Sequence, residues 1–281
     1  MSAFDPSKYK EIEREVYSRT AESYAKYGGS TFEALASPLL EGVELKPGQT
    51  VLDVACGIGI PSLAAAKLVA PNGSVVGIDL APGMVEFARS RASARGLQNA
   101  TFEEGDAESL PFPGNFFDVV LCHLGLIHFT DRVQALREMW RVLKSNGVLA
   151  ISVWSTPTRA RVIGIVSKLV AELWLAAVIP GAPTWFDFGP EGAIEKILSD
   201  TGFRDIRTSR FDVPLQVNSG DDYWKTVLGV SGRLQMLLKN IPPEIAQKIE
   251  NGAKAEAEKC REGQILRIPS EEVMAWAKKV E

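Results

Sequence analysis

Between residues 50 and 154, short apolar runs alternate with stretches of helical periodicity. The runs are rich in Val, Ile and Leu and have the length of strands; they cover 51–55, 74–79, 100–104, 117–123 and 147–154. Helical patterns lie between them, at about 61–70, 82–95 and 131–143. Strands that are apolar almost throughout are typical of a parallel sheet covered on both faces. This alternation therefore predicts a doubly wound α/β fold.

The chain beyond residue 154 has a different pattern. It predicts helices over 158–180 and 190–201, a strand over 204–213, helices over 220–238 and 243–261, and a strand over 272–280. We expect the late strands to extend the same sheet and the added helices to cap it. No repeat, low-complexity tract or linker divides the sequence, so we predict one domain.

Composition limits the classes of function. With 46% hydrophobic and 23% charged residues in 281 positions, the chain can form a sizeable core. A net charge of −4 gives no sign of the basic face that nucleic-acid binding requires. Three scattered cysteines and two histidines predict neither a disulfide framework nor a metal site. The charged N-terminus lacks a signal-peptide core, so we expect a cytoplasmic protein.

The most hydrophobic stretch, residues 162–179, is predicted to be a helix but not a membrane span. It contains Lys168 and Glu172, and it is short of the ~20 apolar residues that a span needs. Three roles stay open for this helix: part of the core, the interface of a homodimer, or a wall of a substrate pocket.

A glycine-rich turn occupies residues 51–60, VLDVACGIGI. A strand leads into the turn and a helix follows, so the backbone can approach a ligand closely and helix N–H groups can face it. The spacing loosely matches a dinucleotide-binding fingerprint, with Asp79 about 20 residues further on.

Three features argue against a dinucleotide. Asp53 precedes the turn directly, where it would repel a pyrophosphate but suit a cofactor with an amino group and a positive sulfonium. Asp106 adds a second acid at the end of the third strand. The Tyr-x-x-x-Lys pair of one common group of hydride-transfer enzymes does not occur in the sequence.

Four segments together resemble the class I S-adenosylmethionine-dependent methyltransferases. They are VLDVACGIG, VVGIDLAPGMVEFAR, FEEGDAESLPFPGNFFDVV and EMWRVLKSNGVLAISVW. The resemblance is to the branch of ubiquinone/menaquinone and other small-molecule methyltransferases. It covers residues 17–154 well, and 188–211 and 263–279 thinly.

The resemblance implies a Rossmann-like fold: a mostly parallel seven-stranded sheet with its last strand antiparallel, plus helical cap insertions. Residues 1–281 would form one domain. Its implied parts are N-terminal helices over 1–49 that close over the cofactor, a cofactor-binding core over 50–154, a helical cap over 155–188 and 214–262, and return strands over 189–213 and 263–281.

The resemblance also implies a set of cofactor-binding residues. They are Tyr24, Asp53, Ala55, Cys56, Gly57, Gly59, Asp79, Leu80, Met84, Asp106, Ala107 and His123. The residues from 55 to 59 would line the methionine moiety, with Asp53 at its amino end. Asp79 would accept hydrogen bonds from both ribose hydroxyls, and Asp106 would accept one from the adenine amine. Leu80 and Met84 would flank the adenine, and Tyr24 would close over the cofactor.

Two positions depart from the family pattern. Ala55 replaces the first glycine of its strictest form, and Ile60 occupies a position where the residue is usually small. Each acidic residue also has a purely structural alternative: Asp53 and Asp106 could cap helices, and Asp79 could be a turn residue.

The two histidines have different expected roles. His128 precedes a helix and would organise its start. His123 ends the fourth strand, at the sheet edge where ligands bind in this fold, and is a candidate general base.

The sequence thus predicts methyl transfer from S-adenosylmethionine to an O, N or C nucleophile of a small, apolar or aromatic acceptor. S-adenosylhomocysteine would be the second product. One alternative is a cofactor-binding enzyme of the same fold that catalyses a non-methylating reaction such as cyclisation. Another is a non-catalytic, partner-activating protein.

Overall fold

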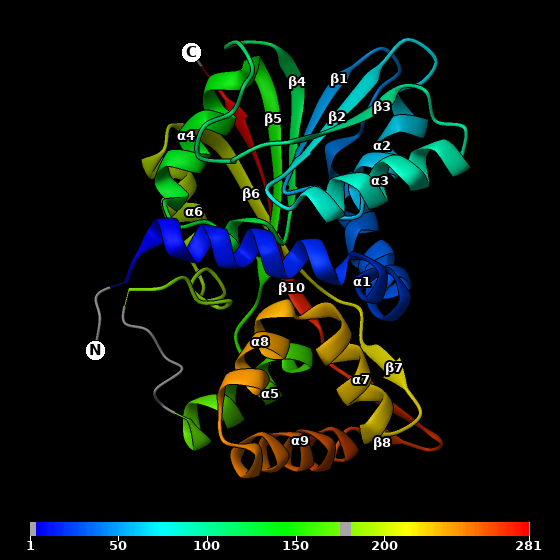
Figure 1. The fold of residues 1–281 in the computed structure, drawn as a ribbon. Coiled ribbons are helices and arrows are strands. Elements are labelled where there is room, and N and C mark those ends of the chain that lie inside the picture. The colour runs from blue at the N-terminus through cyan, green and yellow to red at the C-terminus, as the bar shows by residue number, and fades with distance from the viewer. Residues whose placement is uncertain (1–3, 175–180, 281) are drawn as a thin grey trace.

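The computed structural model describes residues 4–174 and 181–280. Its main sheet has seven strands in the order β3-β2-β1-β4-β5-β10-β6 (Figure 1). Their bounds are β1 Thr50–Val54, β2 Ser74–Asp79, β3 Ala100–Glu104, β4 Phe117–His123, β5 Leu143–Trp154, β6 Phe203–Asp212 and β10 Glu271–Lys279. Only β10 runs antiparallel to its neighbours, β5 and β6. The predicted fold class, including the antiparallel last strand, is confirmed.

Helices cover both faces of this sheet. Helices α2 (Ile60–Val69) and α3 (Pro82–Ala94) lie on one side, and α4 (Arg132–Val142) and α6 (Ala193–Asp200) on the other (Figure 1). Strand β10 contributes to both cores, because Val273, Ala275 and Ala277 belong to one apolar cluster and Met274 and Trp276 to another. The residues of β10 therefore alternate between two buried faces, because helices cover both sides of the sheet and leave neither face in water.

The N-terminal segment forms one helix, α1 (Pro6–Val43), of 38 residues, and not several as the sequence predicted. Asp5 caps it by accepting hydrogen bonds from the backbone N–H groups of Ser7 and Lys8. The helix runs between the sheet and the cap (Figure 1) and packs against α3, α7 and α8. A Cβ at Gly83 would lie 2.1 Å from the Ser18 carbonyl oxygen, so glycine permits the close approach of α3 to α1.

The cap contains α5 (Arg161–Leu173), α7 (Gly220–Val230), α8 (Gly232–Asn240) and α9 (Pro243–Glu258). The helix predicted over 158–180 begins at Arg161 and continues to Leu173; its residues 175–180 lie outside the described residues. The single helix predicted over 220–238 is two helices. They separate at Ser231, whose hydroxyl caps α8 by accepting from Leu234 N.

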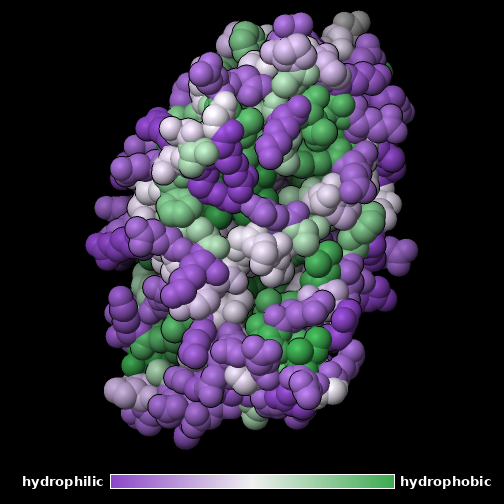
Figure 2. All heavy atoms as spheres, turned by 90° about the vertical axis from the view of Figure 1, so that its right-hand side faces the viewer, coloured by the Kyte–Doolittle hydropathy of each residue, from purple (hydrophilic) through white to green (hydrophobic). Residues whose placement is uncertain are grey.

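The cap also holds a small sheet that the sequence pattern did not predict. Its strands β7 (Leu215–Val217), β9 (Ile265–Ile268) and β8 (Arg261–Glu262) have the order β7-β9-β8. The segment 214–262 is therefore not wholly helical, and residues 265–268 do not join the main sheet. From the side of α2, α3 and α7 the surface is largely hydrophilic, with apolar residues mostly in recesses (Figure 2).

Candidate active site

The strand order reverses between β1 and β4, so their connections leave the sheet in opposite directions. Ligands of doubly wound proteins bind in the crevice that this reversal creates at the carboxyl ends of the strands. A pocket lies there, lined by residues of α1, of the glycine turn and of the ends of β2, β4 and β5. Small-molecule sites of α/β proteins occur preferentially at this position.

Both strands at the reversal end in left-handed backbone. Ala55 (φ 56°) follows β1, and Leu124 (φ 57°) follows β4. This conformation costs a residue with a Cβ roughly 1–2 kcal/mol, and such strain is often found at binding sites. Ala55 thus keeps the conformation that suits the glycine it replaces. Both residues line the pocket, so the strain lies where a ligand would bind.

Asp79 organises the glycine turn from the end of β2. Its Oδ2 accepts a hydrogen bond from Gly57 N (2.8 Å), and its Oδ1 accepts one from Ala81 N (2.9 Å). Burial raises the pKa of this carboxyl, and the two N–H donors oppose that shift. Each carboxylate oxygen has a second lone pair, so the side chain, which lines the pocket, can also accept from ribose hydroxyls.

Asp53 lies beneath the turn and does not line the pocket. It is fully buried, and its Oδ2 accepts from the backbone N (3.1 Å) and the hydroxyl of Ser62 in the first turn of α2. The capping alternative for this residue is therefore observed. Its Oδ1 is buried without a hydrogen-bond partner, and burial raises the pKa of this carboxyl to about 7.

Cys56 and Gly59 also fall outside the pocket lining. The Cys56 side chain is buried in an apolar cluster with Phe102. Gly59 starts α2 with φ 78°, and a Cβ there would come within 3.2 Å of Ala88 and Phe102. These two residues shape the turn that Ala55 and Gly57 present to the pocket.

The remaining cofactor-binding candidates line the pocket: Tyr24, Leu80, Met84, Asp106, Ala107 and His123. Asp106 has partners that were not predicted from the sequence. Lys10 of α1 donates to Asp106 Oδ2 (2.7 Å) and to Glu108 Oε2 (2.6 Å). The backbone N of Glu108 donates to Asp106 Oδ1 (2.9 Å). The side chain of Asp106, which was expected to bind the adenine amine, is therefore already held by a salt bridge from α1.

A second buried cluster fixes α1 over the pocket. Glu13 of α1 accepts from Arg233 Nε of α8, and its other oxygen lies 2.8 Å from His128 Nδ1. Burial lowers the pKa of Arg233 to about 9. The Arg233 guanidinium lies over the rings of Tyr9 and Trp185. His128 thus helps to hold α1 and α8 in place, in addition to its position before α4.

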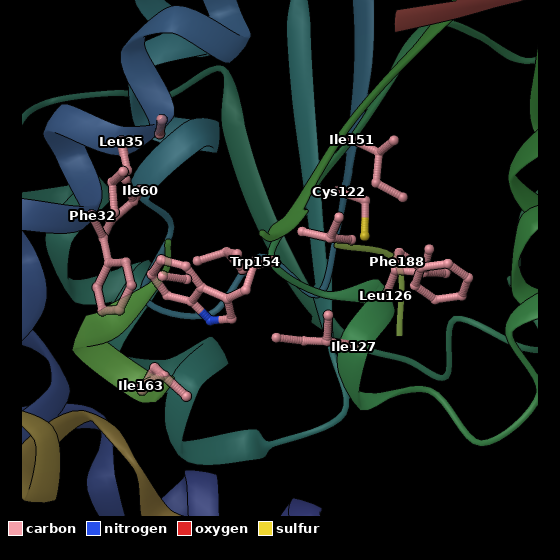
Figure 3. Packing of buried hydrophobic residues seen from close by; sticks show 14 of the residues in the cluster. Phe32, Leu35, Ile60, Cys122, Leu126, Ile127, Ile151, Trp154, Ile163 and Phe188 are labelled. Atoms are coloured by element: carbon pink, nitrogen blue, oxygen red, sulfur yellow. The ribbon is translucent and has the colours of Figure 1, made fainter. Parts of the chain in front are cut away.

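An aromatic wall adjoins the end of β4. Tyr24 stacks on Phe32, with ring centroids 4.9 Å apart and planes at 8°, and Phe32 lies 6.5 Å from Trp154. Phe32, Trp154 and Ile163 of α5 point toward one another (Figure 3), and all three line the pocket. Burial raises the pKa of Tyr24, so its phenol stays protonated at neutral pH. The wall offers flat apolar surface to an acceptor.

His123 extends from the end of β4 into the pocket beside this wall. Its Nε2 lies 3.4 Å from Oε1 of Glu272 on β10, and that carboxylate is fully buried. Glu272 is not among the residues predicted from the sequence, because an acid near the start of a strand is usually exposed to water. Among residues 4–174 and 181–280, no group of three His, Cys, Asp or Glu side chains could hold a metal ion.

A glycine turn, a carboxylate at the end of β2 and an apolar pocket at the switch point of this sheet are typical of α/β enzymes that bind a nucleoside-containing cofactor. Residues 45–178 match the family model described as a methyltransferase domain. The chain is 31% identical over 216 residues to the nocamycin O-methyltransferase of Saccharothrix syringae, which covers 73% of this chain and 77% of the relative. It is 30% identical over 183 residues to a demethylmenaquinone methyltransferase of Staphylococcus aureus, and the match covers 62% of this chain and 75% of the relative. The chain therefore belongs to the class I S-adenosylmethionine-dependent methyltransferases, in their small-molecule branch, and S-adenosylmethionine is its cofactor.

Solved structures share the fold at lower identity. A phosphoethanolamine N-methyltransferase of Haemonchus contortus with bound S-adenosylhomocysteine is 19% identical, with a TM-score of 0.60 over 95% of this chain and 60% of that one. The [4+2]-cyclase SpnF is 22% identical, with a TM-score of 0.56, and the match covers 89% of this chain and 86% of that one. Because one fold serves both reactions, the fold alone does not identify the chemistry. The sequence relatives support methyl transfer.

Proposed function

We propose that this enzyme methylates a small aromatic or otherwise planar apolar acceptor, held against the wall of Tyr24, Phe32 and Trp154. The observation that carries the proposal is that this wall lines one pocket together with His123 and with Asp79, our candidate for holding the cofactor. A flat ring gains dispersion and apolar burial from such a surface. The relatives named for nocamycin and demethylmenaquinone support an organic, apolar acceptor.

The cofactor would occupy the β1 and β2 side of the pocket. Asp79 would accept from the ribose hydroxyls, while Leu80 and Met84 would flank the adenine. Ala55 and Gly57 would contact the methionine moiety through backbone. Asp53, Cys56 and Gly59 would support this turn from behind. The part of the pocket lined by His123, Phe32 and Trp154 would then be left for the acceptor.

Methyl transfer to a nucleophile is an in-line displacement at carbon. The sulfonium supplies the leaving group when the cofactor is bound, so the main task of the chain is to align the acceptor and to exclude water. Such alignment can contribute ~7–11 kcal/mol to lowering the barrier. Helix α1, fastened by Glu13 and Lys10, would close the pocket for this purpose.

His123 is our candidate base for an acceptor that carries a weakly acidic proton. Both imidazoles line the pocket, but His128 Nδ1 is engaged by Glu13, so His123 is the better candidate. General base catalysis typically contributes ~10²–10⁴-fold in rate.

We also propose that the described core and cap act as one domain, since a single apolar cluster includes Leu52 of the core together with Tyr223 and Ile249 of the cap. Cytoplasmic location is supported by three free cysteines. Within residues 4–174 and 181–280, no helix combines the length and apolar character of a membrane span. A homodimer stays a prediction.

The proposal is tested by screening S-adenosylmethionine turnover against phenols, quinols, carboxylic acids and amines of similar size, with S-adenosylhomocysteine release as the readout. We expect planar aromatic acceptors to turn over best. Replacing Phe32 with Ala should raise the acceptor KM and leave cofactor affinity nearly unchanged. Preference for small aliphatic amines would contradict the proposal.

A further inference from the structure

Glu272 is a buried carboxylate with no hydrogen-bond partner. Its residue is 0% exposed, and neither Oε1 nor Oε2 accepts a hydrogen bond among the described residues. Burying an ionised carboxylate is unfavourable unless a partner compensates for the lost water. Glu272 therefore needs a partner that the site itself supplies.

The neighbouring carboxylate behaves differently. Glu271 accepts from the Ser155 hydroxyl (2.7 Å) and forms ion pairs with Arg159 and Arg210, each at 3.3 Å. These contacts hold the pKa of Glu271 below its usual range. Glu271 thus has an ordinary structural role, and it provides a matched control for Glu272.

The charged or titratable groups that face Glu272 and His123 come from three elements. On β4, His123 Nε2 lies 3.4 Å from Glu272 Oε1, and it is the nearby nitrogen that can carry a proton. This Nε2 is also buried without a hydrogen bond. Asp53 of β1 interacts electrostatically with His123, and Tyr24 of α1 with Glu272. Within residues 4–174 and 181–280, neither Glu272 nor His123 forms an ion pair with an arginine or a lysine. The histidine is therefore the available partner for the carboxylate.

We propose that Glu272 is a positioning residue that sets the tautomer of His123. The carboxylate accepts the Nε2 proton, and the Nδ1 lone pair is then directed to the pocket that His123 lines. We expect this 3.4 Å contact to shorten when substrate binds, as catalytic hydrogen bonds commonly do. The acceptor class that fits this arrangement is a molecule with a weakly acidic hydroxyl, a phenol or an enol. This inference rests on the proposed function and names the acceptor's reactive group.

The proposed step balances without a further reactant. The hydroxyl proton moves to His123 Nδ1 as the acceptor oxygen forms a bond to the methyl carbon. The carbon–sulfur bond breaks, and its electron pair stays on sulfur, which becomes neutral. The positive charge passes from the sulfonium to the imidazolium, next to the Glu272 carboxylate, and the proton leaves to water after product release.

The tautomer can be measured without an acceptor. The sequence has two histidines, so nitrogen NMR of ¹⁵N-histidine-labelled protein with S-adenosylhomocysteine gives two sets of ring signals. His128→Gln assigns them by removing one set. We expect wild-type His123 to carry its proton on Nε2, and Glu272→Met to lose that preference. Glu271→Gln should leave the signals unchanged.

Two NMR results would overturn the inference: a wild-type His123 protonated on Nδ1, or an Nε2-protonated ring that persists in Glu272→Met. The wild-type spectrum is decisive even if Glu272→Met does not fold. Failure of the acceptor screen, with the expected tautomer present, would instead count against the proposed function.

Kinetics give the second test. With a phenol that is neutral at the assay pH, Glu272→Met should lower kcat at least ~10-fold, and by no more than the ~10²–10⁴-fold expected for loss of the base. A nitrophenol that is already ionised needs no base, so its kcat should fall much less. Equal losses for both phenols would refute the positioning role.

Discussion

Replacing Asp79 with Ala should remove two functions of one carboxylate. Its oxygens accept from Gly57 N and Ala81 N, so it braces the glycine turn. Under our assignment it also accepts from both ribose hydroxyls. A hydrogen bond to a charged group contributes ~1.5–3 kcal/mol, so we expect S-adenosylhomocysteine binding to weaken by ~2–4 kcal/mol, or ~30- to 1,000-fold.

The two functions can be separated with a modified ligand. Isothermal titration calorimetry would compare S-adenosylhomocysteine with its 2′-deoxy analogue in wild type and Asp79→Ala. If the carboxylate binds the ribose, wild type should lose ~1.5–3 kcal/mol with the deoxy ligand, and the variant should lose little. If Asp79 only braces the turn, both proteins should discriminate equally.

A matched control removes a different carboxylate close by. Glu103 of β3 is exposed and does not line the pocket, so Glu103→Ala should bind both ligands as wild type does. Unchanged affinity in a folded Asp79→Ala protein would refute the assignment of Asp79 to the cofactor site.

Three further predictions concern the site and its support. His123→Gln should lower kcat ~10²–10⁴-fold in steady-state kinetics without weakening cofactor binding, and a kcat within a few-fold of wild type would exclude a base. Burial raises the folded-state pKa of Asp53 to about 7, so this carboxyl ionises between pH 5 and pH 8 and the ionisation opposes folding. Over that range the free energy of unfolding of wild type should fall by ~2–3 kcal/mol relative to that of Asp53→Asn. If urea unfolding gives a difference between the two proteins that does not change with pH, the prediction is contradicted. Glu13→Gln leaves Arg233 without its counter-charge, so the free energy of unfolding should fall by ~3 kcal/mol. Adding Arg233→Met to this variant should restore part of the lost stability. An unchanged unfolding midpoint in Glu13→Gln would contradict the prediction.

The core could be predicted from sequence because its signals are local. Apolar runs separated by helical patterns fix β1 to β5, and the glycine turn marks the end of β1. The short strands β7, β8 and β9 have two to four residues each, too few for a periodic signal. The break between α7 and α8 depends on Ser231, whose capping role competes with a continuous helical pattern.

The parts of the site that were missed depend on distant contacts. Lys10 and Glu13 lie about 100 residues from Asp106 and His128 in the chain, and only the path of α1 brings them together. Asp53 fits either a ligand contact or a helix cap by sequence, and its hydrogen bonds from Ser62 become visible only in the fold. Glu272 lies near the start of a strand, where acids are often exposed, and it is buried because β10 is inserted between β5 and β6.

The most direct test of the central claim follows the methyl group itself. The enzyme would be incubated with S-adenosylmethionine carrying a trideuterated methyl group and with the phenolic acceptor that the screen favours, and products would be analysed by mass spectrometry. Our account predicts one trideuteromethyl group in each product molecule and one S-adenosylhomocysteine formed for each. An altered acceptor without the label, with S-adenosylmethionine unconsumed, would contradict methyl transfer and support a rearrangement such as cyclisation.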